Sequence, residues 1–225
     1  FAGIGIIYNK DIFAKYNLKA PTTYRDLERV CKTLQAKGVT PFAGLLKENW
    51  SMGHFITMVQ TELLVEKGID PSKFVADNNA GKFTSYGVVD TKKLFSTLDF
   101  YRANMDKNAQ EMGWDQQVGD FANGKAAMMV QGLWSYGAAI GANAKLNCGF
   151  VPFPVSNNAK MNKFYADVDS CFGVSSQSSP EKRAAAIKFL SWLSTPQAQK
   201  IWVENYKLTS TFKGADVSAL GSPFV

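Results

Sequence analysis

The chain has 225 residues, of which 46% are hydrophobic and 20% charged, a balance typical of a water-soluble globular protein with one large or two modest domains. No apolar run approaches the roughly 18 residues that a membrane-spanning helix needs. The net charge is +6, but only four of the 25 basic residues are arginines and the lysines are scattered, so we expect a solvated basic surface and no nucleic-acid partner.

Cysteine and histidine are too few and too widely spaced for several kinds of chemistry. Cys31, Cys148 and Cys171 show no C-x-x-C spacing, and His54 is the only histidine. We therefore predict no metal site, no cofactor and no disulfide framework. No nucleophile motif flanks His54, which argues against Ser-His-Asp or Cys-His catalysis and favours a packing or surface role for this histidine.

The first elements along the chain are a strand and a helix. Residues 3–8 are apolar and β-branched, which is typical of a buried strand. Thr23 is placed to cap a helix with Asp26 at its third position, and Gly38 marks the end of that helix. The apolar positions of this helix recur at helical spacing, at Leu27, Val30, Cys31 and Leu34. We predict an amphipathic helix with Cys31 in the core.

The middle of the chain alternates between strand and helix patterns. Residues 39–44 are expected to form a short strand and 55–66 a helix, whereas Pro, Asn and Gly crowd 70–81 and predict a loop. Apolar periodicity and turn residues then predict, in order, a helix at 90–104, a helical turn at 120–123, and strands at 125–131 and 148–155.

The last predicted elements are a strand and two helices. Residues 170–175 are expected to form the strand. The Ser-Pro pair at 179–180 and the Thr-Pro pair at 195–196 each place a capping hydroxyl before a proline that fits the first helical position. We expect the two helices to form a hairpin with Trp192 and Trp202 in the core. The alternation of elements predicts an α/β protein with a partly parallel sheet.

Short motifs run through nearly the whole chain in a distinctive order. The motifs are Gly5-Ile6-Ile7-Tyr8-Asn9-Lys10-Asp11, Pro21-Thr22-Thr23-Tyr24, Phe121-Ala122-Asn123-Gly124-Lys125-Ala126-Ala127-Met128, Gly132-Leu133-Trp134, Phe172-Gly173-Val174-Ser175, Ser179-Pro180-Glu181 and Pro196-Gln197-Ala198-Gln199. Together they resemble the extracellular solute-binding proteins of carbohydrate ABC transporters, the group that includes maltose-binding protein.

The resemblance implies a type II periplasmic-binding-protein-like fold, in which two α/β lobes joined by a hinge hold a sugar between them. Residues 1–165 would form the larger α/β lobe, the C-terminal lobe of the family. Residues 166–208 would be a strand and helical hairpin of the first lobe, and 209–225 a return segment toward the hinge. By the same resemblance, the chain is a fragment that lacks most of the N-terminal lobe and the secretion signal.

The resemblance also implies a function. The protein would capture a mono- or oligosaccharide and deliver it to the permease of an ABC transporter by hinge closure, without chemistry on the sugar. The implied location is extracellular, either in the periplasm or as a lipoprotein on the cell surface.

The chemistry of sugar capture points to particular loop residues. A pyranose presents apolar C–H faces and a rim of hydroxyls, so a binder needs flat aromatic surfaces and fixed polar acceptors. Trp50, preceded by Glu48 and Asn49, lies between a predicted strand and a predicted helix, and Trp134 follows the strand that stops at Gly132. The resemblance implies that both indoles stack on sugar and that Glu48 accepts its hydroxyls. The alternatives are core tryptophans and solvated polar groups.

A second pair of carboxylates leaves more alternatives open. Asp167 and Asp169 lie two residues apart, so on an extended segment both point to one face. They are predicted either to accept sugar hydroxyls beside the hinge or to be a solvated or capping pair. A glycan-cleaving hydrolase could instead use them, with Glu48, as acid and base. A binding protein for another solute, such as a peptide or polyamine, is a further alternative.

Overall fold

One mixed sheet organises the described part of the chain, residues 2–83, 86–167, 171–206, 210, 212–216 and 218 of a computed structural model. Its strands are β1 (Ala2–Asn9), β2 (Thr40–Phe42), β3 (Ala126–Gly132), β4 (Cys148–Val151) and β5 (Tyr165–Asp167). β1 runs antiparallel to β3 on one side and to β4 and β5 on the other, while β2 is parallel to β3. The predicted α/β architecture with a partly parallel sheet is confirmed.

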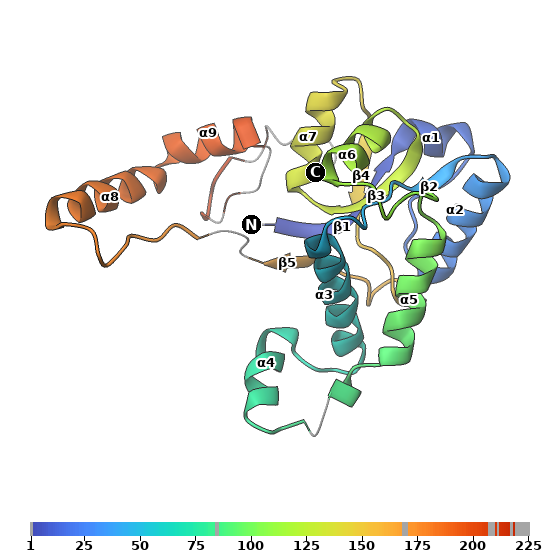
Figure 1. Ribbon diagram of the computed structural model, residues 1–225, viewed down its shortest axis with the longest axis horizontal. Coiled ribbons are helices and arrows are strands. Elements are labelled where there is room, and N and C mark those ends of the chain that lie inside the picture. Colours follow the sequence, from blue (N-terminus) through green and yellow to red (C-terminus); the bar gives the residue numbers. More distant parts are fainter. Residues whose placement is uncertain are drawn as a thin grey trace.

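Helices surround this sheet (Figure 1). Those that flank it or its loops are α1 (Lys10–Lys15), α2 (Tyr24–Ala36), α3 (Asn49–Glu66), α4 (Pro71–Asn79), α5 (Thr91–Ala103), α6 (Trp114–Ala122) and α7 (Trp134–Ala142). Two more, α8 (Pro180–Leu193) and α9 (Pro196–Tyr206), extend away from the sheet at the left of Figure 1. None of the helices in the described ranges is both long and apolar enough to cross a membrane.

Side-chain caps explain where several helices begin. Thr23 Oγ1 accepts a hydrogen bond from the Asp26 N–H at 3.1 Å, and the Asp26 carboxylate accepts one from the Thr23 N–H at 3.2 Å, which is the predicted capping box. Ser179 caps α8, as predicted. Thr195 Oγ1 accepts from the Ala198 N–H at 3.3 Å at the start of α9. Each cap satisfies an N–H that the first turn of a helix leaves unpaired.

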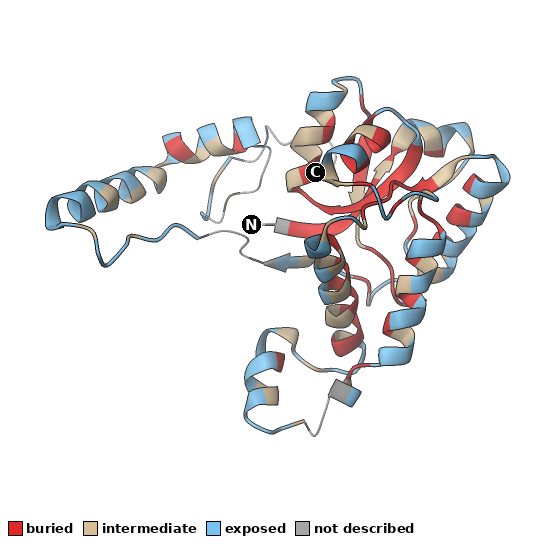
Figure 2. Ribbon diagram, in the orientation of Figure 1, coloured by how far each residue is buried: buried red, intermediate tan, exposed pale blue. Residues whose placement is uncertain are grey.

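Burial is concentrated on the sheet and on the helix faces that cover it (Figure 2). One apolar cluster joins the sheet to α2, α3 and α5, and a second joins its other face to α6 and α7. The neighbours Ile6 and Ile7 belong to different clusters because successive strand residues point to opposite faces. The predicted apolar face of α2 is buried as expected, with Cys31 only 1% exposed.

Some helices differ from the prediction. The loop expected at 70–81 contains α4, because Asp70 accepts a hydrogen bond from the Ser72 N–H at 3.0 Å and Pro71 occupies the first turn. α3 begins earlier than expected, the turn predicted at 120–123 is the end of α6, and α7 was not predicted. The start of α7 has no side-chain cap, so its first turn carries little local signal.

Two predicted strands also need correction. The strand expected at 148–155 ends at Val151, because the prolines that follow cannot donate to a ladder. In the strand expected at 170–175, the described residues 171–175 are not in a strand. Instead β5 lies earlier in the chain, where its pairing partner is β1.

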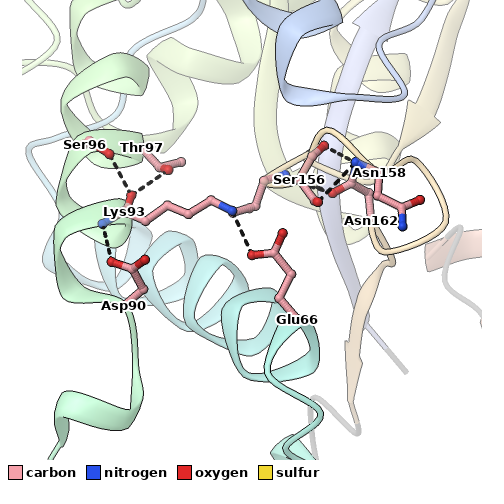
Figure 3. Close-up of polar contacts among 9 residues, drawn as sticks. Glu66, Asp90, Lys93, Ser96, Thr97, Ser156, Asn158 and Asn162 are labelled. Atoms are coloured by element: carbon pink, nitrogen blue, oxygen red, sulfur yellow. Dashed lines mark hydrogen bonds and ion pairs between the residues drawn. The ribbon is translucent and has the colours of Figure 1, made fainter.

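An ion pair joins the last turn of α3 to α5 (Figure 3). Lys93 Nζ on α5 donates to Glu66 Oε2 on α3 at 2.8 Å. Burial opposes ionisation of Glu66, but hydrogen bonds from Lys93 and Ser156 outweigh it and lower the pKa of Glu66. Asp90 caps α5 by accepting from the Lys93 N–H at 2.9 Å. The ion pair therefore fixes α3 at the end opposite to its first turn.

A buried asparagine organises the loop after β4, next to this ion pair (Figure 3). Asn162 Oδ1 accepts from the N–H groups of Val155 at 3.1 Å and Ser156 at 2.9 Å. Asn162 Nδ2 donates to the carbonyl oxygens of Thr22 at 2.8 Å and Ser156 at 2.9 Å. One side chain thus satisfies backbone groups that the loop would otherwise bury unpaired.

The helical pair α8 and α9 leaves apolar side chains uncovered. All of α8 is described and none of it is buried, and Ile187, Phe189 and Trp192 are 53%, 54% and 41% exposed. The expectation that Trp192 lies in the core is therefore wrong. Trp202 is half-buried, with its ring 4.6 Å from that of Tyr206, so it is not a core residue either. Both tryptophans would need a further layer of protein to be buried.

Candidate functional site

Three aromatic rings meet near the starts of α3 and α7, and we call Trp50, His54 and Trp134 the aromatic cluster. The centroid of the His54 ring lies 5.5 Å from that of Trp50, with 64° between the planes. It lies 5.4 Å from that of Trp134, with 56° between the planes. Trp50 is 39% exposed and Trp134 is half-buried. The structure thus brings the two predicted tryptophans together, with His54 between them.

The end of β3 determines where Trp134 lies. β3 stops at Gly132, the Leu133 N–H donates to the Gly3 carbonyl at 3.0 Å, and α7 begins at Trp134. The indole lies against Gly132 so closely that a Cβ atom there would be 2.0 Å from its Cζ3. Glycine at 132 is therefore required for this position of the ring.

Glu48 holds the indole N–H of Trp50. Glu48 is the residue before α3 but does not cap the helix with its side chain. Instead its Oε2 accepts from Trp50 Nε1 at 2.7 Å, and its Oε1 accepts from the Trp114 backbone N–H at 3.0 Å. A carboxylate has about four acceptor positions, so roughly two are left for a ligand. Trp50, expected in a loop, is in the first turn of α3.

Buried side-chain amides hold in place the elements that carry the site. Gln131 Nε2 on β3 donates to Gln117 Oε1 on α6 at 2.8 Å, and Gln117 Nε2 donates to the Ala43 carbonyl at 3.0 Å. On the same helix, Trp114 Nε1 donates to Ser135 Oγ on α7 at 3.0 Å. These hydrogen bonds fix α6 and α7 on the sheet. They thereby also fix the backbone N–H of Trp114, which donates a hydrogen bond to Glu48.

A polar groove of about 490 Å³ opens beside Glu48. Its lining residues come from the loop before α3, the loop before α6 and the first turn of α6: Lys47, Glu48, Asn108, Glu111, Met112, Gly113, Trp114, Asp115 and Gln116. Amides, carboxylates and a lysine dominate this lining. The groove can therefore exchange hydrogen bonds with a hydroxyl-rich molecule. No residue of the aromatic cluster lines it, and Glu48, which accepts from Trp50 Nε1, is the residue that links the groove to the cluster.

The structure gives less information about the other predicted site residues. Asn49 is the exposed first residue of α3. Asp167 ends β5, and its backbone pairs with Ala2. Asp169 lies outside the described residues. Whether these side chains join Glu48 in one site stays a prediction. Within the described ranges, no group of three or more His, Cys, Asp or Glu residues is placed to hold a metal ion.

Two residues of the site were missed by sequence reasoning. His54 follows Trp50 by four residues, and this spacing on a helix is the signal that could have found it. The contact of Trp114 with Glu48 uses its backbone N–H, so its side-chain type carried no signal.

Comparison with known proteins gives a consistent set of relatives. The chain is 26% identical over 203 residues to the multiple sugar-binding protein of Streptococcus mutans, covering 87% of this chain and 46% of that protein. It is 28% identical over 202 residues to an uncharacterized ABC transporter extracellular-binding protein of Pyrococcus horikoshii, covering 86% and 41%. The chain thus spans less than half the length of these two relatives.

Solved structures confirm the predicted fold class. The solute-binding protein RafE in complex with raffinose superposes with a TM-score of 0.81 at 22% identity, over 99% of this chain and 57% of that one. A binding protein of an ABC transporter from Bifidobacterium animalis subsp. lactis, in complex with mannobiose, gives 0.73 at 20% identity, over 97% and 51%. The family model of bacterial extracellular solute-binding proteins matches residues 1–200, and the chain belongs to that family.

Proposed function

We propose that this chain is part of the sugar-binding component of an ABC transporter, which captures a mono- or oligosaccharide without altering it. The observation that carries this proposal is the aromatic cluster with the Glu48 carboxylate at its edge. Trp50 keeps 39% of its surface exposed although its N–H is fixed by Glu48 at 2.7 Å. A fixed, solvent-facing indole beside a carboxylate matches the apolar faces and hydroxyl rim of a pyranose.

The relatives described above support the same substrate class. They include a multiple sugar-binding protein and proteins bound to raffinose and to mannobiose. We propose by analogy a permease partner in the membrane and a location outside the cytoplasm, in the periplasm or as a surface lipoprotein. Ligand contacts from two lobes would exist together only in a closed state, so sugar would shift the protein toward closure.

The proposed division of the chain is residues 1–165 as the larger lobe, 166–208 as part of the other lobe, and 209–225 as a segment returning to the hinge. The uncovered apolar side chains of α8 support this division, because they need a further layer to pack against. Relatives more than twice as long as the matched region have the residues for such a layer. Asp167 and Asp169, at the boundary, are proposed to accept sugar hydroxyls, as is Asn49.

The contacts of Glu48 argue against a general-acid role for this residue in glycan cleavage. A general acid must carry a proton that it can donate to the leaving oxygen. Both Glu48 oxygens are instead acceptors, one from an indole N–H and one from a backbone N–H. This residue is therefore placed to hold Trp50 and accept hydroxyls.

Saturation-transfer NMR on the full 225-residue chain tests the proposal, since it detects even weak binding. Raffinose, mannobiose and spermidine serve as probes. We expect transfer to at least one sugar and not to spermidine. We expect W50A and W134A to weaken binding by roughly tenfold or more, as central aromatic contacts do. W192A, which removes an exposed tryptophan on α8, is the matched control and should bind as the unmodified chain does.

Three results would contradict the proposal. Sugar signals that persist unchanged in W50A and W134A would place binding elsewhere. Transfer to spermidine alone would indicate a different solute. Release of monosaccharides from the probe sugars during the experiment would show an enzyme.

A further inference from the structure

We propose that His54 is a positioning residue, an aromatic spacer that sets the orientation of the Trp50 and Trp134 indoles for stacking on a ligand. The inference deepens the proposed function and rests on it. Trp50 belongs to α3 and Trp134 to α7, so no single element fixes their relative orientation. In the described part of the chain, His54 is the ring that contacts both, at centroid distances of 5.5 Å and 5.4 Å.

The contact with Glu48 does not by itself fix the indole of Trp50. The indole turns about two side-chain bonds, Cα–Cβ and Cβ–Cγ. Glu48 Oε2 holds its Nε1 at 2.7 Å, but Glu48 is itself only half-buried, so the carboxylate and the indole can move together. The His54 ring, tilted by 64° against the indole one helical turn away, opposes that joint movement.

Trp134 is constrained in a complementary way. Its six-membered ring lies against Gly132, which limits approach to the strand but does not stop sliding across it. The His54 ring lies beside the indole at 56° and restricts that sliding. With the spacer in place, both indoles have one defined orientation before a ligand arrives.

The environment of the imidazole indicates that His54 acts through the shape of its ring and not through hydrogen bonds to other groups of the protein. His54 Nδ1 is buried and has no hydrogen-bond partner among the residues that the structure describes. A buried nitrogen without a partner is unfavourable and calls for an explanation. A spacer role supplies one, because the position between the indoles needs a flat ring and makes no demand on Nδ1.

Two substitutions separate the effect of the His54 ring's shape from the effect of its two nitrogens. H54A removes the ring, and H54F keeps a flat ring but removes both nitrogens. T57A, at an exposed position on the same helix, is the control. The readouts are the near-ultraviolet circular dichroism of the indoles without sugar, the thermal unfolding of each variant, and its affinity for whichever probe sugar the unmodified chain binds.

We expect H54A to weaken the indole dichroism and lower sugar affinity by roughly 5- to 100-fold, because binding must then order two loose side chains. H54F should restore most of both signals and unfold at the same or a higher temperature. T57A should change neither signal.

Other outcomes would overturn the proposal. If H54F loses as much affinity as H54A while both remain folded, a ring nitrogen contacts the ligand and the spacer role is wrong. If H54A keeps the dichroism of the unmodified chain, the indoles do not depend on His54. The dichroism needs no sugar, so it decides the positioning role even if the chain binds none of the probes and the proposed function fails.

Discussion

Glu62, on the buried side of α3, is a carboxyl group that the folded protein keeps neutral. Burial is the main cause that raises its pKa from 4.5 to about 8, and nearby Glu66 adds to the effect. The Val155 N–H, which lies close enough to oppose this shift, donates to Asn162 at 3.1 Å. Neither Glu62 oxygen has a hydrogen-bond partner in the described part of the chain.

Stability should therefore fall as pH rises from 4.5 to about 8. In this window the unfolded chain has released the Glu62 proton and the folded chain retains it, so the free energy of unfolding decreases by up to about 1.4 kcal/mol for each pH unit. E62Q should remove this contribution and be the more stable protein near pH 8. Urea unfolding at three pH values measures it. E111Q, at an exposed site, is the control, and an unchanged slope in E62Q would contradict the assignment.

Gly132 gives a second prediction for single residues. G132A should displace the Trp134 indole, because the new Cβ would lie 2.0 Å from Cζ3. We expect a loss of about 1–3 kcal/mol of stability, as for other overpacked sites, and weaker sugar binding. G141A is the matched control, since a Cβ on Gly141 in α7 meets nothing within 4 Å and should stabilise the helix by about 0.5–1 kcal/mol. Equal thermal stability in the two variants would refute the contact.

Single residues of the site differ in how far the sequence alone predicts them. Trp50, Trp134 and Glu48 were selected by chemistry and by resemblance, and the structure places all three within one set of contacts. The sequence favours a packing or surface role for His54, because no nucleophile motif flanks it. Its place between two indoles depends on how the start of α7 lies against α3, which no local pattern encodes.

At the scale of elements, α3 links the site to the rest of the fold. Its first turn carries Trp50, and its last turn carries Glu66, paired with Lys93 beside the loop that Asn162 organises. N162A should leave several buried backbone groups unpaired and lower stability by roughly 2–4 kcal/mol. Urea unfolding of N158A, in the exposed part of the same loop, is the comparison. A loss in N162A no larger than in N158A would show that the loop repairs these bonds with water.

Helices and strands are predicted best from the sequence where residues that mark their ends, such as helix caps, are present. α2, α8 and α9 begin at capping residues, Thr23, Ser179 and Thr195, and were predicted close to their observed starts. α4 has the equally valid cap Asp70, but the Asn and Gly residues after it favoured a loop. β5 is three residues long, and its strand character comes from pairing with β1, so it has no signal of its own.

At the scale of the whole molecule, the uncovered face of α8 should determine how the chain behaves alone. With Ile187, Phe189 and Trp192 between 41% and 54% exposed, we expect binding of a hydrophobic dye and self-association that grows with concentration. The double variant F189S/W192S should reduce both and change stability by less than about 1 kcal/mol, since α8 buries none of its residues. V75S, at an exposed apolar site on α4, should change neither in dye titration and sedimentation velocity.

The position of β1 in the sheet has a consequence for how the protein is made. β1 lies near the start of the chain, but the strands that pair with it are far downstream: Tyr8 pairs with Met128, 120 residues later, and Ala2 with Asp167, 165 residues later. At a synthesis rate of about 5–20 residues per second, this apolar strand stays unpaired on the ribosome for roughly 6 to 30 seconds. Such distant pairings also slow folding after release. The nascent segment therefore depends on being shielded from other chains until its neighbours in the sheet have been translated.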